Sequence, residues 1–282
     1  MAQRALPSVA TTSVTPRLGF RRLWPGWPLF AASLPMLAFL VIPIVALLLR
    51  VSPADLLANL MSREVSQALS LSIMTAFVTT AIILVAGTPL AYLLARYSFR
   101  GRTVLETLVD LPMILPPAVA GIALLLTFGR RGLLGQPMSD FGIEVAFTPF
   151  AVVLAQVFVS APYYIKSAMA GFVEVDRDLE HAAATDGAAG RHVFRYVTLP
   201  LAAPALFGGA VMAWARALGE FGATIIFAGN LPGRTQTMPL AIYMGFEMHL
   251  NVALTLAAIL LALSFGVLFA VKRILKQRVG LL

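Results

Sequence analysis

Residues 69–95 read LSLSIMTAFVTTAIILVAGTPLAYLLA, a run without one charged side chain. A bilayer core about 30 Å thick needs roughly 20 apolar residues of α-helix to cross it. The run is long enough, and its Pro89 is tolerated because neighbouring membrane helices satisfy the backbone groups that a proline frees. The stretch therefore predicts a membrane-spanning helix, and it decides the fold class.

Five further apolar stretches meet or approach this length, and they cover residues 29–49, 111–128, 145–165, 201–228 and 248–271. The whole chain is 59 % hydrophobic and 12 % charged, whereas soluble domains carry roughly 25 % charged residues. So few charged side chains argue against a soluble enzyme. We expect an all-α integral membrane protein with six transmembrane helices.

The predicted spans divide the chain into four parts. Residues 1–27 are expected to form a cytoplasmic tail, 28–50 the first transmembrane helix, 65–272 a core with five further helices, and 273–282 a second cytoplasmic tail. The first span is too long for the apolar region of a signal peptide, and no small-residue cleavage site follows it before Arg50. We therefore expect that helix to be retained.

The net charge of +8 raises the question of nucleic-acid binding, but the basic residues separate apolar runs and build no basic face. Sorted by loop, five lie on one side of the predicted membrane and Arg216 lies within a span. By the positive-inside rule the richer side is cytoplasmic, which places both termini in the cytoplasm. The excess of basic residues thus orients the helices, and no nucleic-acid partner is expected. The cytoplasmic side holds Arg4, Arg17, Arg21, Arg22, Arg96, Arg100, Arg102, Lys166, Arg177, Arg191, Arg195, Lys272, Arg273, Lys276 and Arg278.

The longest cytoplasmic connection, residues 166–200, has the pattern of a short helix ended by Gly187 and Gly190. Acidic residues cluster at the start of that helix, where they suit the helix dipole. Small residues follow, which give the helix little bulk and suit it to a groove on a partner protein. A solvated loop is the alternative interpretation.

This connection resembles the EAA loop of binding-protein-dependent ABC importer permeases, whose pattern is Glu-Ala-Ala, three residues, Gly, nine residues and Ile-x-Leu-Pro. His181 stands at the position of the family's Glu, with Glu180 beside it, and Val197 replaces the Ile. The role of the family's Glu is therefore not carried over to His181. The matching residues are Ala182, Ala183, Gly187, Leu199 and Pro200.

The resemblance implies a type I permease fold whose EAA loop, between the fourth and fifth helices, is a coupling helix on a cytoplasmic ABC ATPase. It also implies an extracytoplasmic binding protein and a second permease copy. A nucleotide-binding P-loop needs Gly-x-x-x-x-Gly-Lys before Ser or Thr, and only Lys166 precedes a Ser, with Ile165 in place of the Gly. ATP is therefore expected to be hydrolysed by a partner subunit.

Arg216 and Glu220 are four residues apart in the fifth predicted span and so share one face of a helix. An ionised side chain at mid-membrane costs about 2.5–3.5 kcal/mol on insertion scales, so both are expected to face the bundle interior or a wet cavity, as a pair. The pair is either a structural ion pair or part of a translocation pathway.

The run from Arg216 to Tyr243 is similar to the molybdate/tungstate branch of the permease family, and less closely to the sulfate branch. Its elements Gly-Glu-Phe-Gly (219–222) and Asn-Leu-Pro-Gly-Arg-Thr-Gln-Thr (230–237) carry this likeness, as does Leu-Pro-Pro at 115–117. A tetrahedral dianion needs hydrogen-bond donors and positive potential. The residues expected to line the pathway or its gate are Arg216, Glu220, Gly222, Thr224, Asn230, Arg234 and Thr235.

The sequence thus predicts a non-catalytic permease subunit that admits an oxyanion, molybdate first, by alternating access. Sulfate or tungstate transport and an ion-driven secondary transporter are the alternatives. The chain has no cysteine, and its three histidines are not at metal-ligand spacing, so neither a metal nor another cofactor is expected.

Overall fold

A computed structural model describes residues 27–279; residues 1–26 and 280–282, with most of the predicted N-terminal tail and the end of the C-terminal one, lie outside the described residues. The chain divides into two units, residues 1–46 and 47–282, and each is described by itself. Helix α1 (Trp27–Arg50) includes the predicted span 29–49, contains Pro35 and Pro43 and buries none of its residues. It is long and apolar enough to cross a bilayer.

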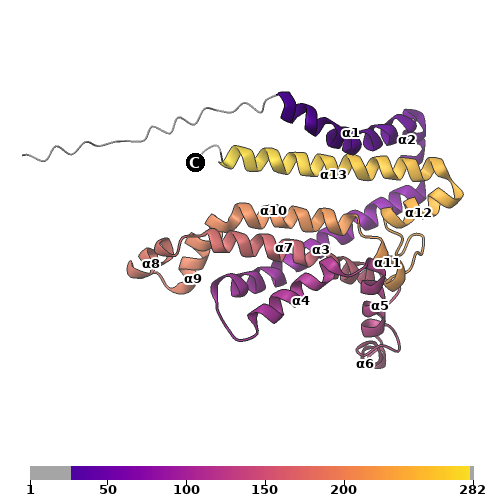
Figure 1. Cartoon of the computed structure of the whole chain (residues 1–282). Coiled ribbons are helices and arrows are strands. Elements are labelled where there is room, and N and C mark those ends of the chain that lie inside the picture. Colours follow the sequence, from indigo (N-terminus) through magenta and orange to yellow (C-terminus); the bar gives the residue numbers. More distant parts are fainter. Residues whose placement is uncertain (1–26, 280–282) are drawn as a thin grey trace, which may run out of the picture. The chain divides into compact units, whose positions relative to one another are not determined.

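Three long helices form the core of the second unit: α3 (Arg63–Arg96), α7 (Pro149–Glu174) and α10 (Leu199–Leu218), which lie side by side in Figure 1. Glycines bring α7 and α10 close together, since a Cβ atom at Gly171 would stand 2.4 Å from the Cβ of Ala205. Close approach at small residues is how membrane helices gain packing energy without a hydrophobic drive. Tyr164 and Phe172 of α7 fill the centre of this core and are fully buried.

Polar side chains join the same helices inside the bundle. Thr79 of α3 donates a hydrogen bond to Gln156 of α7 at 3.0 Å, and the hydroxyl groups of Thr88 and Tyr164 lie 2.5 Å apart. Buried polar groups in a membrane bundle find partners across helices in this way. These contacts fix which face of α3 meets α7.

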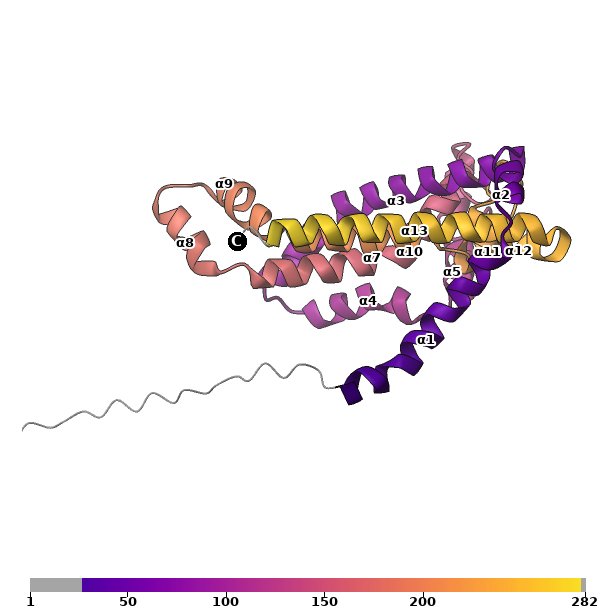
Figure 2. The same ribbon diagram turned by 90° about the horizontal axis from the view of Figure 1, so that it is seen from above.

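The C-terminal helix α13 (Leu250–Val279) packs against α10, α12 (Met238–Met248) and α2 (Pro53–Leu60), and Figure 2 shows it passing over α10. Asn59 of α2 donates to the hydroxyl of Thr255 in α13 at 3.0 Å. The predicted span 248–271 corresponds to this helix, which begins two residues later, at Leu250, and continues to Val279. The short helices α2, α6 (Gly135–Asp140) and α12 are absent from the sequence prediction.

The predicted third span, 111–128, is not one straight helix. It comprises the end of α4 (Arg102–Ile114) and α5 (Pro117–Phe128), which are bent by 115° at the break between them. Pro116 and Pro117 explain the break, because a proline disfavours helical backbone in the residue before it and donates no hydrogen bond. Among the described residues, five helices are long and apolar enough to cross a bilayer, or six if this bent pair is one span.

The predicted fifth span, 201–228, also breaks. Helix α10 ends at Leu218, and after Gly219, Glu220 and Phe221 the chain forms a short helix, α11 (Gly222–Phe227), packed against α5 and α7. Two glycines within four residues weaken the helix here. The expectation that Arg216 and Glu220 share one face of a continuous helix is therefore wrong: Arg216 is in the last turn of α10, and Glu220 follows the helix.

The predicted cytoplasmic connection, 166–200, is shorter than expected because α7 continues to Glu174. Lys166 therefore lies within α7, where it pairs with Asp110 of α4 at 2.8 Å. The connection itself holds α8 (Arg177–Thr185), α9 (Gly190–Val193) and one π-helical segment, η1 (Phe194–Thr198), which runs directly into α10.

Candidate functional site

The loop between α7 and α10 has a defined shape. Asp176 begins α8, and its carboxylate accepts a hydrogen bond from the backbone N–H of Asp178 at 2.9 Å. Gly187 ends the helix with a φ of +89°, in the left-handed region that glycine adopts at little cost. The N–H of Ala188 returns to the carbonyl of Ala183 at 3.1 Å. These local bonds fold α8 back toward α9.

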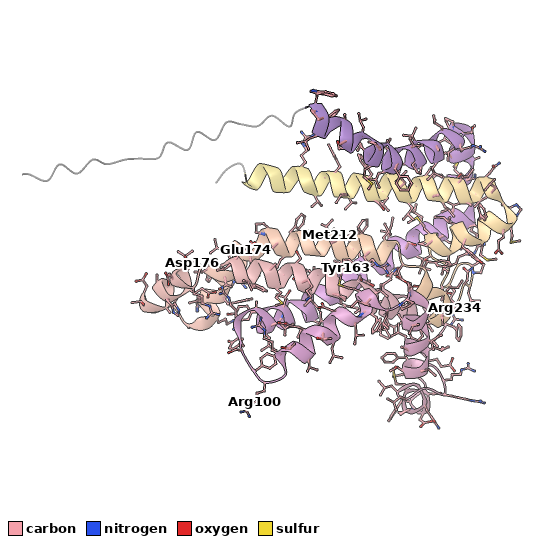
Figure 3. All side chains as sticks on the ribbon, viewed as in Figure 1. Arg100, Tyr163, Glu174, Asp176, Met212 and Arg234 are labelled. Carbon is pink, nitrogen blue, oxygen red and sulfur yellow. The ribbon has the colours of Figure 1, made fainter. Side chains whose placement is uncertain are left out.

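Helix α8 projects from the bundle, and none of its residues is buried. His181 and Ala182 are exposed and Ala183 is half-buried. An open groove of about 550 Å³ lies between the end of α8 and α9–η1, with Ala183, His192 and Tyr196 along it. Leu199 and Pro200, at the far end of the predicted motif, form the first turn of α10. In Figure 3, Glu174 and Asp176 mark this end of the unit, and Arg234 lies at the other.

Glu180 is the one residue of the predicted motif that is tied to the helix bundle by its side chain. Its Oε1 atom accepts a hydrogen bond from Nη2 of Arg96, the last residue of α3, at 3.1 Å. The same oxygen accepts from the hydroxyl of Thr198, the last residue of η1, at 2.5 Å. Arg96 also donates to the carbonyl of Val175 at 3.0 Å. One carboxylate oxygen therefore joins α3, α8 and η1.

A second charged pair stands at the other end of α10. Arg216 donates from Nη1 to Oε2 of Glu220 at 2.7 Å, and Oε1 of Glu220 accepts from the backbone N–H of Ala223 at 2.8 Å. The side chain of Glu220 is 1 % exposed and that of Arg216 27 %. The predicted pairing is present, and the carboxylate also satisfies a free N–H at the start of α11.

Close packing holds α11 in place. A Cβ atom at Gly222 would lie 2.5 Å from the Cβ of Pro117 in α5, and one at Gly121 would lie 2.9 Å from the carbonyl oxygen of Ala223. Only glycine leaves room for these approaches. The predicted gate residue Gly222 is therefore a packing residue of the α5–α11 contact in this structure.

The remaining predicted pathway residues lie in and after α11. Thr224 and Thr235 are fully buried, and the hydroxyl of Thr235 accepts from the N–H of Leu231 at 3.0 Å. The Thr224 hydroxyl and Oδ1 of Asn230 are buried without a hydrogen-bond partner among the described residues. Most buried polar atoms in native proteins have a partner, so these two are exceptions.

Arg234 is exposed and stands apart from the Arg216–Glu220 pair. It lines a cavity of about 150 Å³ together with Arg130, Glu144 and Phe147. Arg130 and Glu144 pair at 3.0 Å on the rim. Among the described residues, no hydrogen bond or ion pair joins Arg234 to Arg216 or Glu220, so the structure divides the predicted pathway set into two groups.

Sequence reasoning missed Arg96 and Thr198 as partners of Glu180. Arg96 lies 84 residues before Glu180, and nothing in the sequence places the end of α3 beside α8. Thr198 occupies the variable position of the motif and carries no signal of its own. Arg216 and Glu220, by contrast, were found because a four-residue spacing is visible in the sequence.

Comparison with known proteins places this architecture. The family model described as binding-protein-dependent transport system inner membrane component matches residues 87–280. The chain belongs to this family. It is thus a multi-pass inner-membrane permease subunit of an ABC importer, and like the family it is not itself an enzyme, which confirms the predicted class.

Individual relatives cover nearly the whole chain. The molybdenum transport system permease protein ModB of Mycobacterium tuberculosis is 41 % identical over 249 residues, which are 88 % of this chain and 93 % of the relative. The sulfate transport system permease protein CysT of Salmonella typhimurium is 35 % identical over 269 residues, 92 % of this chain and 96 % of the relative.

A solved structure supports the fold of the permease. A bacterial ABC transporter involved in import of the acidic polysaccharide alginate matches with a TM-score of 0.71 at 15 % sequence identity. The match covers 89 % of this chain and 96 % of the other. The predicted all-helical permease architecture is therefore confirmed.

Proposed function

We propose that this permease carries molybdate across the inner membrane into the cytoplasm, by alternating access driven by a partner ATPase. The observation that carries the proposal is the 41 % identity to a molybdenum permease over 88 % of the chain. Sulfate is the second candidate substrate, favoured by the relative at 35 % identity over 92 % of the chain. Tungstate shares the charge and tetrahedral shape of both, so it belongs to the same proposal.

Residues on both sides of the α10–α11 break form the proposed translocation gate. Arg216 supplies positive potential at the rim of α10, and Glu220 keeps the site from holding the dianion tightly. The buried, unpartnered oxygens of Thr224 and Asn230 support a second state of this segment in which they find partners. Thr235 and Arg234 follow in the same segment, and Gly222 lets it pack against α5.

Helix α8 is the proposed coupling helix on the cytoplasmic ATPase. It projects from the bundle with all its residues at least partly exposed, and the groove beside it is lined by small residues together with His192 and Tyr196. An Arg at Gly187 would have to adopt a φ of +89° and would place a long cation beside the groove. We expect Gly187→Arg to abolish stimulation of the partner ATPase while membrane insertion is retained; unchanged stimulation would remove α8 from the mechanism.

The coupling role fixes the proposed orientation. Helix α8 and the C-terminal end of α13 lie at one end of the second unit, and α12 lies at the other (Figures 1 and 2). With α8 in the cytoplasm, the C-terminal tail is cytoplasmic and residues 65–272 form the permease core. The four arginines of the N-terminal tail assign that tail to the cytoplasm as well, by the positive-inside rule. The cavity with Arg130, Glu144 and Arg234 then faces outward, where an extracytoplasmic binding protein would dock and deliver substrate.

A second permease copy is proposed to pair through one face of α10. Along this face Leu201 and Met212 are 50 % and 51 % exposed, and a Cβ at Gly208 would meet no atom within 4 Å. Small residues beside exposed apolar ones suit a close helix–helix contact in a membrane. Arg216 lies at the edge of the same face, which a lipid-facing surface does not favour.

The absence of cysteine makes the pairing testable. Met212→Cys in the assembled transporter is expected to give an oxidised dimer band, because two copies of α10 would meet there. Phe265→Cys, which is equally accessible on α13 at 67 % exposure, is the matched control. A dimer band from the control alone, or from neither variant, contradicts pairing through α10.

The substrate is tested by uptake of radiolabelled molybdate into proteoliposomes that contain the permease, its ATPase and its binding protein. We expect ATP-dependent uptake that unlabelled tungstate inhibits and a tenfold excess of sulfate does not. Inhibition by sulfate at equal concentration would transfer the proposal to sulfate. Uptake driven by an ion gradient without ATP would overturn the importer mechanism.

A further inference from the structure

We propose that Glu180 is a positioning residue, not a contact to the ATPase: with Arg96 and Thr198 it ties the coupling helix to the bundle. The proposal rests on the assignment of α8 as the coupling helix. The three residues come from α8, α3 and η1, and all their bonds meet at one oxygen atom, Oε1 of Glu180. We call this set the tether.

Burial separates Glu180 from the other charged side chains of α8. The side chains of Arg96 and Glu180 are 8 % and 18 % exposed, whereas His181 next to Glu180 is exposed. A shielded ion pair is screened less by salt than an exposed one. The carboxylate oxygen that two donors already occupy points into the loop, so the exposed neighbours of Glu180 are the residues left to meet another protein.

The tether is the polar link that α8 has to other elements. Within the described part of the chain, no other side chain of α8 forms a hydrogen bond or an ion pair with a residue outside it, apart from the cap at Asp176. Without the tether, α8 would be held through its backbone ends, one of which is the Gly187 turn. A helix attached in that way can swing without moving the bundle.

The end of α3 that carries Arg96 is packed firmly against α7 and η1. One turn before Arg96, the ring of Tyr92 packs edge-on against Phe172 of α7 and Phe194 of η1, with centroids 5.3 Å and 5.0 Å apart. Such aromatic contacts add to the burial energy of the rings. Because η1 continues into α10 without a break, a displacement of α8 that reaches Thr198 and Arg96 is passed to α10 and α3 together.

The first test measures hydrogen exchange in the permease alone, where no ATPase is needed. Arg96→Ala and Glu180→Ala are each expected to raise exchange in residues 177–189 by about fivefold or more, with the cores of α3 and α7 unchanged. The effect of the double variant should be smaller than the sum of the two single effects, because both changes break the same Arg96–Glu180 bond. Asp178→Asn, which neutralises an exposed carboxylate on the same helix, is the control. Unchanged exchange in the two single variants, or additive effects in the double variant, overturns the tether.

The second test uses the full transporter with ATPase and binding protein. Both single variants should bind the ATPase as the natural permease does, yet transport roughly five- to tenfold less molybdate per ATP hydrolysed. If Glu180→Ala loses ATPase binding and Arg96→Ala does not, Glu180 contacts the ATPase directly and the proposal is wrong. If Gly187→Arg leaves ATPase stimulation intact, the coupling role of α8 fails, while the exchange result on the tether stands.

Discussion

Two glutamates of this permease each accept hydrogen bonds from an arginine and from one further donor, at opposite ends of α10. Glu220 finds both donors within its own segment, at Arg216 and at the N–H of Ala223. Glu180 finds them on other elements, at Arg96, which is 84 residues away in sequence, and at Thr198. The first pair stabilises a local turn, whereas the second connects three elements that are distant in sequence.

This difference separates structural from mechanical roles. Glu220 is 1 % exposed, so removing it leaves the N–H of Ala223 without its acceptor, and the end of α10 and the start of α11 lose their side-chain link. Glu180 is 18 % exposed, and α3, α8 and η1 keep their own backbone bonds without it. Loss of Glu220 is thus a defect of folding, and loss of Glu180 a defect of transmission.

The largest expected effect follows from Glu220→Ala. It removes the partner of Arg216 and the cap of α11, and breaking a buried ion pair costs about 3–5 kcal/mol. Because Arg216 is 27 % exposed and regains some hydration, we expect the lower end of that range. The apparent melting temperature of the detergent-solubilised permease should fall by roughly 6–10 °C.

Glu220→Gln is the matched variant, since its amide oxygen still accepts from Ala223 and only the charge is lost. We expect its melting temperature to fall by less than half as much as that of the alanine variant. Glu180→Ala is the contrast, with a shift of at most a few degrees. Equal shifts at positions 180 and 220 would erase the distinction between the two ends of α10.

The α5–α11 packing should show the next largest effect. In Gly222→Ala, the new methyl group would stand 2.5 Å from the Cβ of Pro117, whose ring cannot rotate away. Overpacking of this kind costs about 1–3 kcal/mol. Gly266→Ala on α13 is the control, since its Cβ meets nothing within 4 Å and a helical alanine is favourable. In thermal unfolding, the melting temperature of the control should equal or exceed that of the natural permease, and that of Gly222→Ala should be lower. An unchanged melting temperature for Gly222→Ala would show that α11 is not packed as described.

The sequence predicted the long helices because an apolar run of sufficient length has few other solutions. It failed where backbone chemistry interrupts such a run. The predicted span 111–128 contains the Pro116–Pro117 pair, at which the chain turns by 115°. The predicted span 201–228 likewise contains Gly219, at which α10 ends, and Gly222, at which α11 begins. Hydropathy predicts whether a residue lies in the membrane or in water. Whether the helix continues there depends on the backbone conformations that each residue allows.

The candidate site shows the same limit. Residues spaced for one helix face, such as Arg216 and Glu220, were paired correctly, because four residues along a helix fix a distance. The partner of Glu180 depends on how α3 packs on α7, which no local pattern encodes. His181 drew attention because it departs from the family pattern, although the neighbouring Glu180 holds the ion pair.

The smallest expected effect sharpens the comparison at the coupling end. Gly187→Ala must adopt a φ of +89°, which costs about 1–2 kcal/mol for a residue with a Cβ, although that Cβ would meet no atom within 4 Å. Gly187→Asn should cost less, because asparagine tolerates the left-handed region. Gly190→Ala is the control, since it has the same open surroundings without a positive φ.

Gly187→Ala should destabilise the loop of residues 177–189 and leave the helix bundle as stable as before, because α8 is attached to the bundle by its ends and by Glu180. Hydrogen exchange in residues 177–189 should rise by roughly five- to thirtyfold, in the order Ala, Asn and then the Gly190→Ala control, with the melting temperature unchanged. A fall in melting temperature as large as that of Gly222→Ala would mean that the loop and the bundle unfold together. The coupling end would then be as much a part of the folded core as the Glu220 end, and the contrast between the two glutamates would not hold.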